Sequence, residues 1–554
     1  MISRIPLLVL LVSAGAFAEP VPVTPPTVGS ANTAAADPGV PRPPTTPCHV
    51  RLFTALRFAD FSPQQFAYTP PAACPGRWEK VVLEADYSVE AGRQFDRTAT
   101  LWIGGVNVYF GTTAEPSKTV ARAWHVERDL TEYSAMLRTA SAGRAELGNL
   151  VDAHFTSSLW GTAQLAFYPA SSDDDGESAA KTADLVLPLS GGPTGGTVAL
   201  FDPSAELAAT FQLPANVEKA YLDVVLQHQG ANDEFWYTCV PNDLANALQS
   251  CAGTAFREGQ LSIDGQPAGV VPIFPWIFTG GIDPYFWRPI PAPQALNFVP
   301  YRLDVTPFAG LLSNGKPHRF SIRVTNNSQY FQTTATLLLY LDHEATQVTG
   351  EVTQNTIGTP APVVTPALTT AKDGTVSGTV TTTSSRKFVL AGWTKGSHGR
   401  VKTEIRQQID FSNAQQFVSP TSAPVAYVQN INQSTSILST TRVHGGGDDG
   451  DARESTTRMS WPLEVDLTIP ATASFIQVGR ISQAYHRVDS DGDKSSVVSN
   501  SGEWADTYPT QVGQSGAQRY FSSGPGDQCY SRALTAAGGL LTSIVDGAGC
   551  GQPE

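Results

Sequence analysis

The chain has 554 residues, of which 41% are hydrophobic and 16% charged, with 48 glycines, 41 prolines and a net charge of −14 at pH 7. This length predicts two to four domains, and abundant Gly and Pro with few charges favour short strands and turns over long helices. The negative charge argues against nucleic acid as a partner, and the sequence has no basic patch that would suggest binding to an anionic membrane.

Residues 1–18 have the pattern of a secretory leader. Arg4 supplies a positive start, Ile5 to Val12 is an apolar run too short to span a bilayer, and Ala16-Phe17-Ala18 fits a cleavage site before Glu19. We therefore expect a secreted or periplasmic protein without a membrane segment. Residues 19–46, rich in Pro, Thr and Ala, are predicted to be an extended or disordered spacer without a core.

Six cysteines fit an oxidising compartment, and they allow fifteen pairings. Local spacing favours Cys48–Cys74, Cys239–Cys251 and Cys529–Cys550, each closing a modest loop. A free catalytic thiol is the less favoured alternative. No CxxC motif or Cys/His cluster indicates zinc, so we expect no metal and no cofactor.

Residues 47–178 alternate between strand and turn patterns, which predicts a first β-sandwich. Trp78–Tyr87 is a predicted strand, and Ala99–Val108 is a second one beginning after Gln94-Phe95-Asp96-Arg97-Thr98. Asp96 is expected where a hairpin enters its second strand. Its adjacent Arg97 leaves two interpretations open, a structural ion pair at the sheet end or a catalytic carboxylate.

Residues 179–350 repeat this organisation and predict a second β-sandwich. Asp304-Val305-Thr306 resembles Asp129-Leu130-Thr131 of the first half, which hints at two similar domains. Residues 351–370 are expected to be a linker. Residues 371–554, rich in Ser, Thr, Gly and Gln, are predicted to form a further β domain of short alternating strands. In that domain Asp489–Asp493 fits a hairpin turn better than a calcium loop.

Several motifs in the first 350 residues carry a family resemblance. They are, in this order, Trp78-Glu79-Lys80-Val81, Gln94-Phe95-Asp96-Arg97, Thr113-Ala114-Glu115-Pro116, Leu147–Asp152, Asn232–Tyr237 and Phe278–Pro289. Together they resemble the peptide-N4-(N-acetyl-β-glucosaminyl)asparagine amidase A family, the acidic N-glycanases of plants and bacteria. The resemblance covers roughly residues 48–350.

A weaker likeness extends to the flavobacterial N-glycanase F, and it implies two antiparallel jelly rolls with the site at their junction. Phe95-Asp96-Arg97 is similar to that family's aromatic-Asp-Arg motif, whose Asp is the main catalytic group. Leu213 to Leu222 is similar to a strand that precedes its second acidic motif, here Asp233-Glu234. The insertion from Thr238 to Thr254 leaves open whether Glu234 or Glu258 has that second role.

The resemblance implies hydrolysis of the amide between an asparagine side chain and its first N-acetylglucosamine, with an N-glycopeptide or N-glycoprotein as substrate. Asp96 is the candidate base or nucleophile, Arg97 orients it or holds the oxyanion, and Glu234 assists protonation of the leaving nitrogen. Acidic groups behind them and flat aromatic or planar side chains are expected to bind substrate, although single aromatics more often belong to a core. These candidates are Asp233, Glu115, Glu258, Trp102, Trp236, Tyr237, Tyr285, Trp287 and Arg288.

Two other classes of function remain open. A secreted carbohydrate-binding or adhesion protein built from β-sandwiches has the same composition, and a glycoside hydrolase also needs two carboxylates. None of the nine histidines lies in a Ser- or Cys-centred motif such as GxSxG, so no nucleophilic triad is predicted. We expect a monomer that works in an acidic medium.

Overall fold

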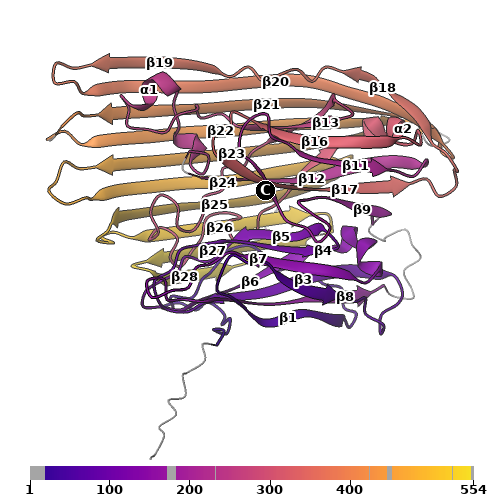
Figure 1. Cartoon of the computed structure of the whole chain (residues 1–554), viewed down its shortest axis with the longest axis horizontal. Helices are drawn as coiled ribbons and strands as arrows, with labels where there is room; N and C mark the ends of the chain where they lie inside the picture. Colours follow the sequence, from indigo (N-terminus) through magenta and orange to yellow (C-terminus); the bar gives the residue numbers. More distant parts are fainter. Residues whose placement is uncertain are drawn as a thin grey trace, which may run out of the picture.

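The computed structural model describes residues 19–170, 182–230, 232–422, 424–445, 452–526 and 528–550. The expected leader, residues 1–18, and the acidic stretch Asp173–Glu177 lie outside them. Within these ranges the chain is almost entirely antiparallel β-structure, with two four-residue helices and short 3-10 turns (Figure 1). The predicted all-β class is confirmed.

The first sandwich stacks a sheet with the order β1-β8-β3-β6 on a sheet with the order β2-β7-β4-β5. Apolar side chains of both sheets alternate inward, as Val81, Leu83 and Ala85 do on β3, and form one core. The strands are β1 (Cys48–Phe58), β2 (Gln64–Tyr68), β3 (Trp78–Val89), β4 (Thr98–Ile103), β5 (Val106–Thr112), β6 (Arg122–Asp129), β7 (Ser141–Leu147) and β8 (Leu159–Pro169).

The second sandwich has the sheet order β10-β17-β12-β15, with β9 also pairing β17, opposite a sheet with the order β11-β16-β13-β14. The helices α1 (Asn242–Ala245) and α2 (Ala309–Leu312) lie in its connections. Its strands are β9 (Leu185–Leu189), β10 (Val198–Leu200), β11 (Leu207–Gln212), β12 (Val217–Gln229), β13 (Glu258–Ile263), β14 (Gln266–Pro272), β15 (Tyr301–Asp304), β16 (Pro317–Thr325) and β17 (Tyr330–Leu341).

The predicted Asp-apolar-Thr turn has the same structure in both sandwiches. The backbone N–H of Thr131 donates to Asp129 Oδ1 at 2.9 Å, and that of Thr306 donates to Asp304 Oδ1 at 2.9 Å. In each case a 3-10 turn follows at once, Thr131–Tyr133 and Thr306–Phe308. Since a carboxylate that binds the backbone two residues later pre-forms such a turn, the recurrence in sequence reflects a recurrence in structure.

The segment that carries Asp96 differs from the expected hairpin. Strands β3 and β4 belong to different sheets, so residues 90–97 cross from one layer of the sandwich to the other. Strand β4 pairs with β5 through the tight Gly104-Gly105 turn and with β7. The turn-like residues between β3 and β4 fit either a hairpin within one sheet or a crossing between two sheets. Only the pairing of β3 and β4 with distant strands decides between these two connections.

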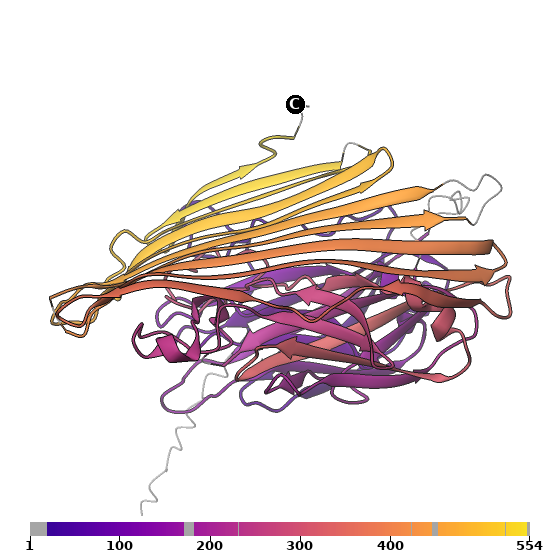
Figure 2. The same ribbon diagram turned by 90° about the horizontal axis from the view of Figure 1, so that it is seen from above.

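The C-terminal part forms one long sheet that covers the second sandwich as a single curved layer (Figure 2). Its strands are longer than the predicted ones, and β20 and β21 have 21 residues each. The strands are β18 (Thr349–Asn355), β19 (Val363–Thr370), β20 (Val376–Gly396), β21 (Gly399–Ser419), β22 (Tyr427–His444), β23 (Arg453–Ile469), β24 (Gln477–Asp491), β25 (Lys494–Tyr508), β26 (Ser515–Gly524), β27 (Gln528–Ala537) and β28 (Leu540–Asp546).

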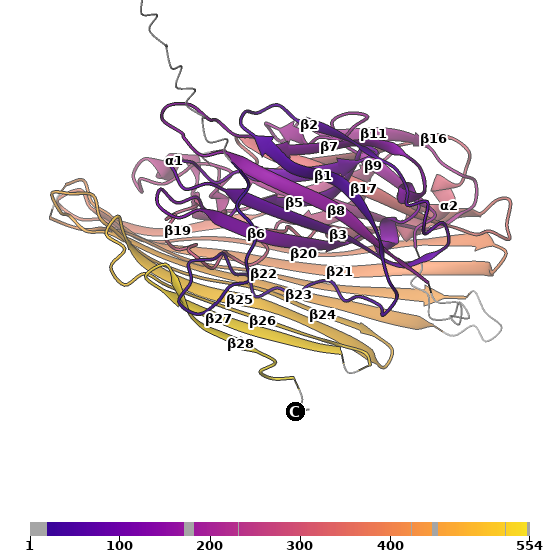
Figure 3. The same ribbon diagram turned by 90° about the horizontal axis from the view of Figure 1, so that it is seen from below.

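Two expected connectors pack on this sheet. Most of the range 351–370, expected as a linker, lies in β18 and β19, which both pair with β20. The expected spacer is extended, but it crosses the sheet (Figure 3), where Ala34 and Ala36 are buried and the Ala36 N–H donates to Gln518 Oε1 at 2.8 Å. Small side chains such as alanine give no clear burial signal in a sequence, but they allow the backbone to lie close to the sheet. This spacer therefore does contribute to a core.

All six cysteines are paired, as Cys48–Cys74, Cys239–Cys251 and Cys529–Cys550. The pairing expected from local spacing is confirmed. The stretch Asp489–Asp493 contains the β24–β25 hairpin turn, because β24 ends at Asp491, whose backbone pairs with that of Lys494 across Gly492-Asp493. Among the described residues, no helix has the length and hydropathy needed to cross a membrane.

Candidate active site

A cleft of about 440 Å³ lies where the two sandwiches meet. The first sandwich contributes Asp96 and Arg97, and the second contributes Glu234 from the turn after β12. Asp96 and Glu234 are the two carboxylates among the described lining residues. The lining is completed by Phe61, Phe95, Thr98, Thr112, Gly148, Gln229, Gly230, Phe278 and Tyr330.

Asp96 is held by its chain neighbours on both sides. The buried Gln94 donates through Nε2 to the carbonyls of Leu150 and Ser157, both at 2.9 Å. The Arg97 N–H donates to Thr113 Oγ1 at 2.9 Å, and the Thr113 N–H returns a 2.8 Å bond to the Arg97 carbonyl. Asp96 is thereby fixed at the entrance to β4 with its side chain toward the cleft.

The backbone of Gly280, from the β14–β15 connection, donates a hydrogen bond to the Asp96 carboxylate. The approach is so close that a Cβ at position 280 would lie 2.2 Å from Asp96 Oδ1. Burial raises the pKa of Asp96, while this N–H and the charge of Arg97 oppose the rise. Asp96 is therefore a destabilised carboxylate, which makes it a stronger base than a solvated one.

Arg97 does not form the structural ion pair that was the alternative for Asp96. Among the residues described, its guanidinium has no carboxylate within salt-bridge distance and lies over the rings of Phe61 and Phe95, 5.8 and 5.6 Å from their centres. Its Nε is buried without a hydrogen-bond partner. Because Arg97 is only half-buried and lines the cleft, its positive charge can attract a substrate oxygen there.

Glu234 is held through its own backbone and through its neighbour Asp233. Its N–H donates to the Gly230 carbonyl at 2.8 Å. The preceding Asp233 is fully buried, accepts from Arg257 Nε at 2.9 Å, and also accepts from the backbone N–H groups of Ser328 and Gln329. Asp233 therefore anchors the turn and does not face the cleft. Burial, with the negative charge of Asp96 second, raises the pKa of Glu234 to about 7.

Glu234 and Glu258 differ in position. Glu258 begins β13, is 2% exposed and forms an ion pair with Arg386 of β20. It connects the second sandwich to the long sheet and does not line the cleft. Glu115 also lies behind the cleft, where its Oε1 accepts from Arg288 at 3.0 Å and its Oε2 is buried without a donor. Burial, then the charge of Asp96, raises the pKa of Glu115.

Most of the predicted sugar-binding aromatics belong to the core. Trp102, Trp236, Tyr237 and Trp287 are at most 2% exposed. Tyr285 is partly exposed, but its ring stacks on Tyr508 and it carries the Arg288 guanidinium 4.9 Å from its centre. None of these side chains lines the cleft, so the expectation that they bind substrate is wrong for the cleft that Asp96 and Glu234 share.

Other aromatics occupy the rim of the cleft. Phe61 and Phe95 are 68% and 51% exposed, and Phe201, 63% exposed, lies 5.7 Å from the ring of Tyr330. Phe95 adjoins Asp96 in the motif, and Phe61 stands alone in the polar turn Asp60-Phe61-Ser62-Pro63. An aromatic in a polar turn has no strand face to bury it, which is the sequence signal that could have identified Phe61.

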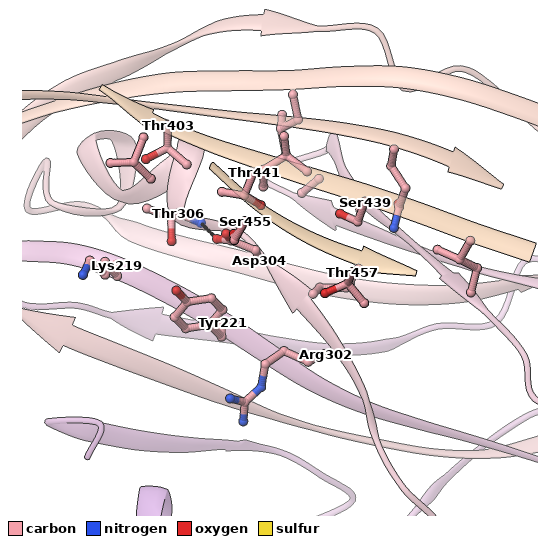
Figure 4. Close-up of a pocket in the computed structure, with 18 of the residues that line it drawn as sticks. Lys219, Tyr221, Arg302, Asp304, Thr306, Thr403, Ser439, Thr441, Ser455 and Thr457 are labelled. Atoms are coloured by element: carbon pink, nitrogen blue, oxygen red, sulfur yellow. Dashed lines mark hydrogen bonds between the residues drawn. The ribbon is translucent and has the colours of Figure 1, made fainter. Parts of the chain in front are cut away.

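A second cleft, of about 480 Å³, lies at the opposite end of β12 between the second sandwich and the long sheet (Figure 4). Two of its charged groups are already bound: Asp304 accepts from the Thr306 N–H, and Arg302 makes two 2.7 Å bonds to Asp223. The hydroxyls of Thr403, Ser439 and Thr441 line its other wall. None of the candidate catalytic or substrate-binding residues lines this cleft.

One described group of side chains has the spacing of a metal site. Ligand atoms of Glu218, Asp342 and His398 lie within 4.8 Å of one another. Asp342 already accepts from the Ser397 N–H and Oγ, both at 2.7 Å. This group braces the β20–β21 turn against the second sandwich and is not part of the cleft at Asp96.

Comparisons with known proteins agree with the motifs. Residues 40–357 match the family model of peptide N-acetyl-β-D-glucosaminyl asparaginase amidase A. The chain is 34% identical over 418 residues to peptide-N4-(N-acetyl-β-glucosaminyl)asparagine amidase A of Prunus dulcis, covering 72% of this chain and 71% of that protein.

Among solved structures, PNGase F of Flavobacterium meningosepticum aligns at 12% identity and a TM-score of 0.35, covering 53% of this chain and 96% of that one. PNGF-II aligns at 13% identity and a TM-score of 0.35, covering 54% of this chain and 66% of that one. The extent of the family match and the identity to the Prunus dulcis protein show that this chain belongs to the peptide N-acetyl-β-D-glucosaminyl asparaginase amidase A family.

Proposed function

We propose that the chain is a peptide:N-glycanase, which hydrolyses the amide between an asparagine side chain and the proximal N-acetylglucosamine of an N-glycopeptide or N-glycoprotein. The carrying observation is that Asp96 and Glu234, from two different sandwiches, face one cleft. Membership of the amidase A family supports the same reaction. The products are an aspartyl peptide and a glycosylamine, which then loses ammonia.

Asp96 is proposed to remove a proton from the attacking water, or to attack the amide carbonyl itself. Its raised pKa makes it a better base than a solvated carboxylate. Arg97, a cation that lines the cleft beside Asp96, is proposed to stabilise the negative charge that develops on the carbonyl oxygen. The amide nitrogen leaves only after it gains a proton, and Glu234, with a pKa of about 7, holds one in acidic medium.

The rim of exposed aromatics is proposed to contact the sugar and the adjoining peptide. Phe61 and Phe95 offer flat apolar faces beside the carboxylates, and sugar rings pack on such faces through their C–H groups. The buried candidates Asp233 and Glu115 are proposed to support the site from behind, through their ion pairs with Arg257 and Arg288.

We further propose export through the leader at residues 1–18, in keeping with three disulfides that need an oxidising compartment. The acting form is proposed to be a monomer. One chain supplies both carboxylates and the arginine of the cleft, so the site needs no residue from a second copy.

Mass spectrometry of a digested glycopeptide tests the reaction. The wild-type protein is expected to release the glycan and leave aspartate, which raises the mass of the former asparagine peptide by about 1 Da. A peptide that keeps one N-acetylglucosamine on asparagine indicates a glycosidase, and an unchanged glycopeptide indicates a binding protein. Either result contradicts the proposal.

Gly280→Ala is expected to lower kcat by about 10- to 100-fold, the range of a misplaced positioning group. The added Cβ would lie 2.2 Å from Asp96 Oδ1, so the loop or the carboxylate must shift. Steady-state kinetics on a glycopeptide measure the effect. Gly524→Ala, at the end of β26 where a Cβ meets nothing within 4 Å and φ is not positive, is the control for a glycine replacement away from the cleft. Equal kcat values for Gly280→Ala and wild type would show that this approach does not matter.

A further inference from the structure

The loop that carries Gly280, residues 273–300 between β14 and β15, lies between the cleft and the long sheet. The long sheet supplies hydrogen bonds for the carbonyls of this irregular backbone, which a buried loop cannot leave unpaired. The donors are Gln477 to Ile282 (3.1 Å), Gln483 to Pro275 (2.6 Å), Gln514 to Tyr285 (3.1 Å) and Arg288 (2.9 Å), and Trp504 Nε1 to Ile290 (3.0 Å).

One contact between loop and sheet joins two acids. Asp283 of the loop is 1% exposed, and Asp506 of β25 is 3% exposed. Asp283 Oδ2 and both carboxylate oxygens of Asp506 are buried without a donor in good hydrogen-bond geometry. The two side chains are at hydrogen-bond distance from each other, yet two ionised carboxylates can only accept. A proton on one of them supplies the donor that the contact lacks.

From these contacts we infer that the long sheet is a positioning element of the active site, and that a proton shared by Asp283 and Asp506 keeps the Gly280 loop in place against Asp96. The inference rests on the proposed function for its effect on catalysis. Its effect on folding does not depend on that function.

The surrounding charges favour this proton. Burial, and then the neighbouring Asp506, raise the pKa of Asp283 to about 7, against the Tyr285 N–H and the positive charge of Arg288. Burial also raises the pKa of Asp506, while the backbone N–H of Thr507 opposes the rise. Two like charges in contact away from water repel strongly. Above pH 7 both acids are ionised, and the loop and the sheet then repel each other at this contact.

The direction of the pH effect follows from linkage. The pKa of Asp283 is higher in the folded chain than in the unfolded one, so the folded state holds the proton more tightly. The stabilisation is complete below the unfolded value, about 4, and it is lost as pH rises through about 7. The wild-type thermal midpoint should therefore fall between these pH values, and the catalytic rate should fall at its upper end.

Asp506→Asn tests the inference, because an amide donates to Asp283 at every pH. Thermal midpoints from pH 4 to 8 are expected to show a smaller decline for this variant than for wild type. Its kcat profile, normalised to its own maximum, is expected to extend at least half a pH unit further to the alkaline side, with KM little changed. Asp466→Asn removes an exposed acid from the same sheet and serves as the control.

Three results would overturn the inference. The first is a midpoint decline in Asp506→Asn equal to that of wild type. The second applies if Asp506→Asn does not fold. It is a midpoint decline in Asp283→Asn equal to that of wild type, since this variant supplies the amide from the loop side. The third is a rise in the wild-type midpoint at pH 8 on adding 1 mM Ca²⁺ that Asp506→Asn lacks, which would show a cation between the acids. Absence of amidase activity with an altered decline would reject only the proposed function.

Discussion

Asp96→Asn is expected to lower kcat by about 100- to 10 000-fold, the range for a lost general base, while the glycopeptide still binds. Asparagine keeps the shape of aspartate and can still lie beside Gly280, but it cannot accept a proton from water at neutral pH. Because Asp96 alone faces the cleft from the first sandwich with a raised pKa, no described neighbour can replace it as the base.

The same substitution is expected to leave the thermal midpoint at pH 7 equal to that of wild type or slightly higher. Burial makes the ionised Asp96 unfavourable in the folded state, so removing the charge removes a cost to folding. Differential scanning calorimetry measures the midpoint and a glycopeptide assay measures kcat. The control is Asp243→Asn, which removes an exposed acid on α1. Wild-type turnover in Asp96→Asn, or a collapsed midpoint, would return Asp96 to a structural role.

The sequence predicts best where local patterns decide the structure. Alternation over Trp78–Tyr87 predicts β3, and the Asp-apolar-Thr spacing predicts the turns at Asp129 and Asp304. The junction of Asp96 and Glu234 was predicted from the family resemblance, not from local pattern. Its physical basis is long-range, since Gly280 contacts Asp96 although most of the sequence of the two sandwiches lies between them.

Which of the candidate aromatics are buried could not be read from the sequence. Trp102 lies on β4, both faces of which are buried, because a glycine-rich loop covers it. A Cβ on Gly195 of that loop would lie 2.6 Å from the Trp102 ring. No residue near Trp102 in the sequence predicts that this loop covers it. Likewise, Glu258 is removed from the site by Arg386 of β20, a partner that only the three-dimensional fold supplies.

Glu234→Gln is expected to lower kcat by about 10- to 100-fold in acid, a moderate loss for a general acid, and to remove the alkaline limb that this group imposes. In wild type the rate should be bell-shaped, because Asp96 must be ionised and Glu234 protonated. With the pKa of Glu234 at about 7, the alkaline limb falls near that pH, and the acid limb lies above the ordinary range of aspartate. A glutamine side chain does not titrate, so its variant should lack this limb.

The shared proton of Asp283 and Asp506 is also lost near pH 7. The alkaline decline in kcat therefore has two causes, Glu234 and the loop, which must be separated. Glu234→Gln alone should keep a weaker alkaline decline from the loop, and the double variant with Asp506→Asn should keep almost none. If the decline in Glu234→Gln has the midpoint and depth of wild type, Glu234 is not the acid. A maximum well above pH 7 in wild type leads to the same conclusion.

A direct titration of Glu234 follows from its coupling to Asp96. The negative charge of Asp96 is the second cause that raises the pKa of Glu234, after burial. Asp96→Asn removes that charge and leaves the burial, so the pKa of Glu234 should fall below 7 while staying above the ordinary value of a glutamate. Carboxyl ¹³C NMR of labelled Glu234, with Glu234→Gln to assign the signal, measures this value without any turnover. An unchanged titration in Asp96→Asn would mean that the two carboxylates do not interact across the cleft, and the division of acid and base between them would then fail.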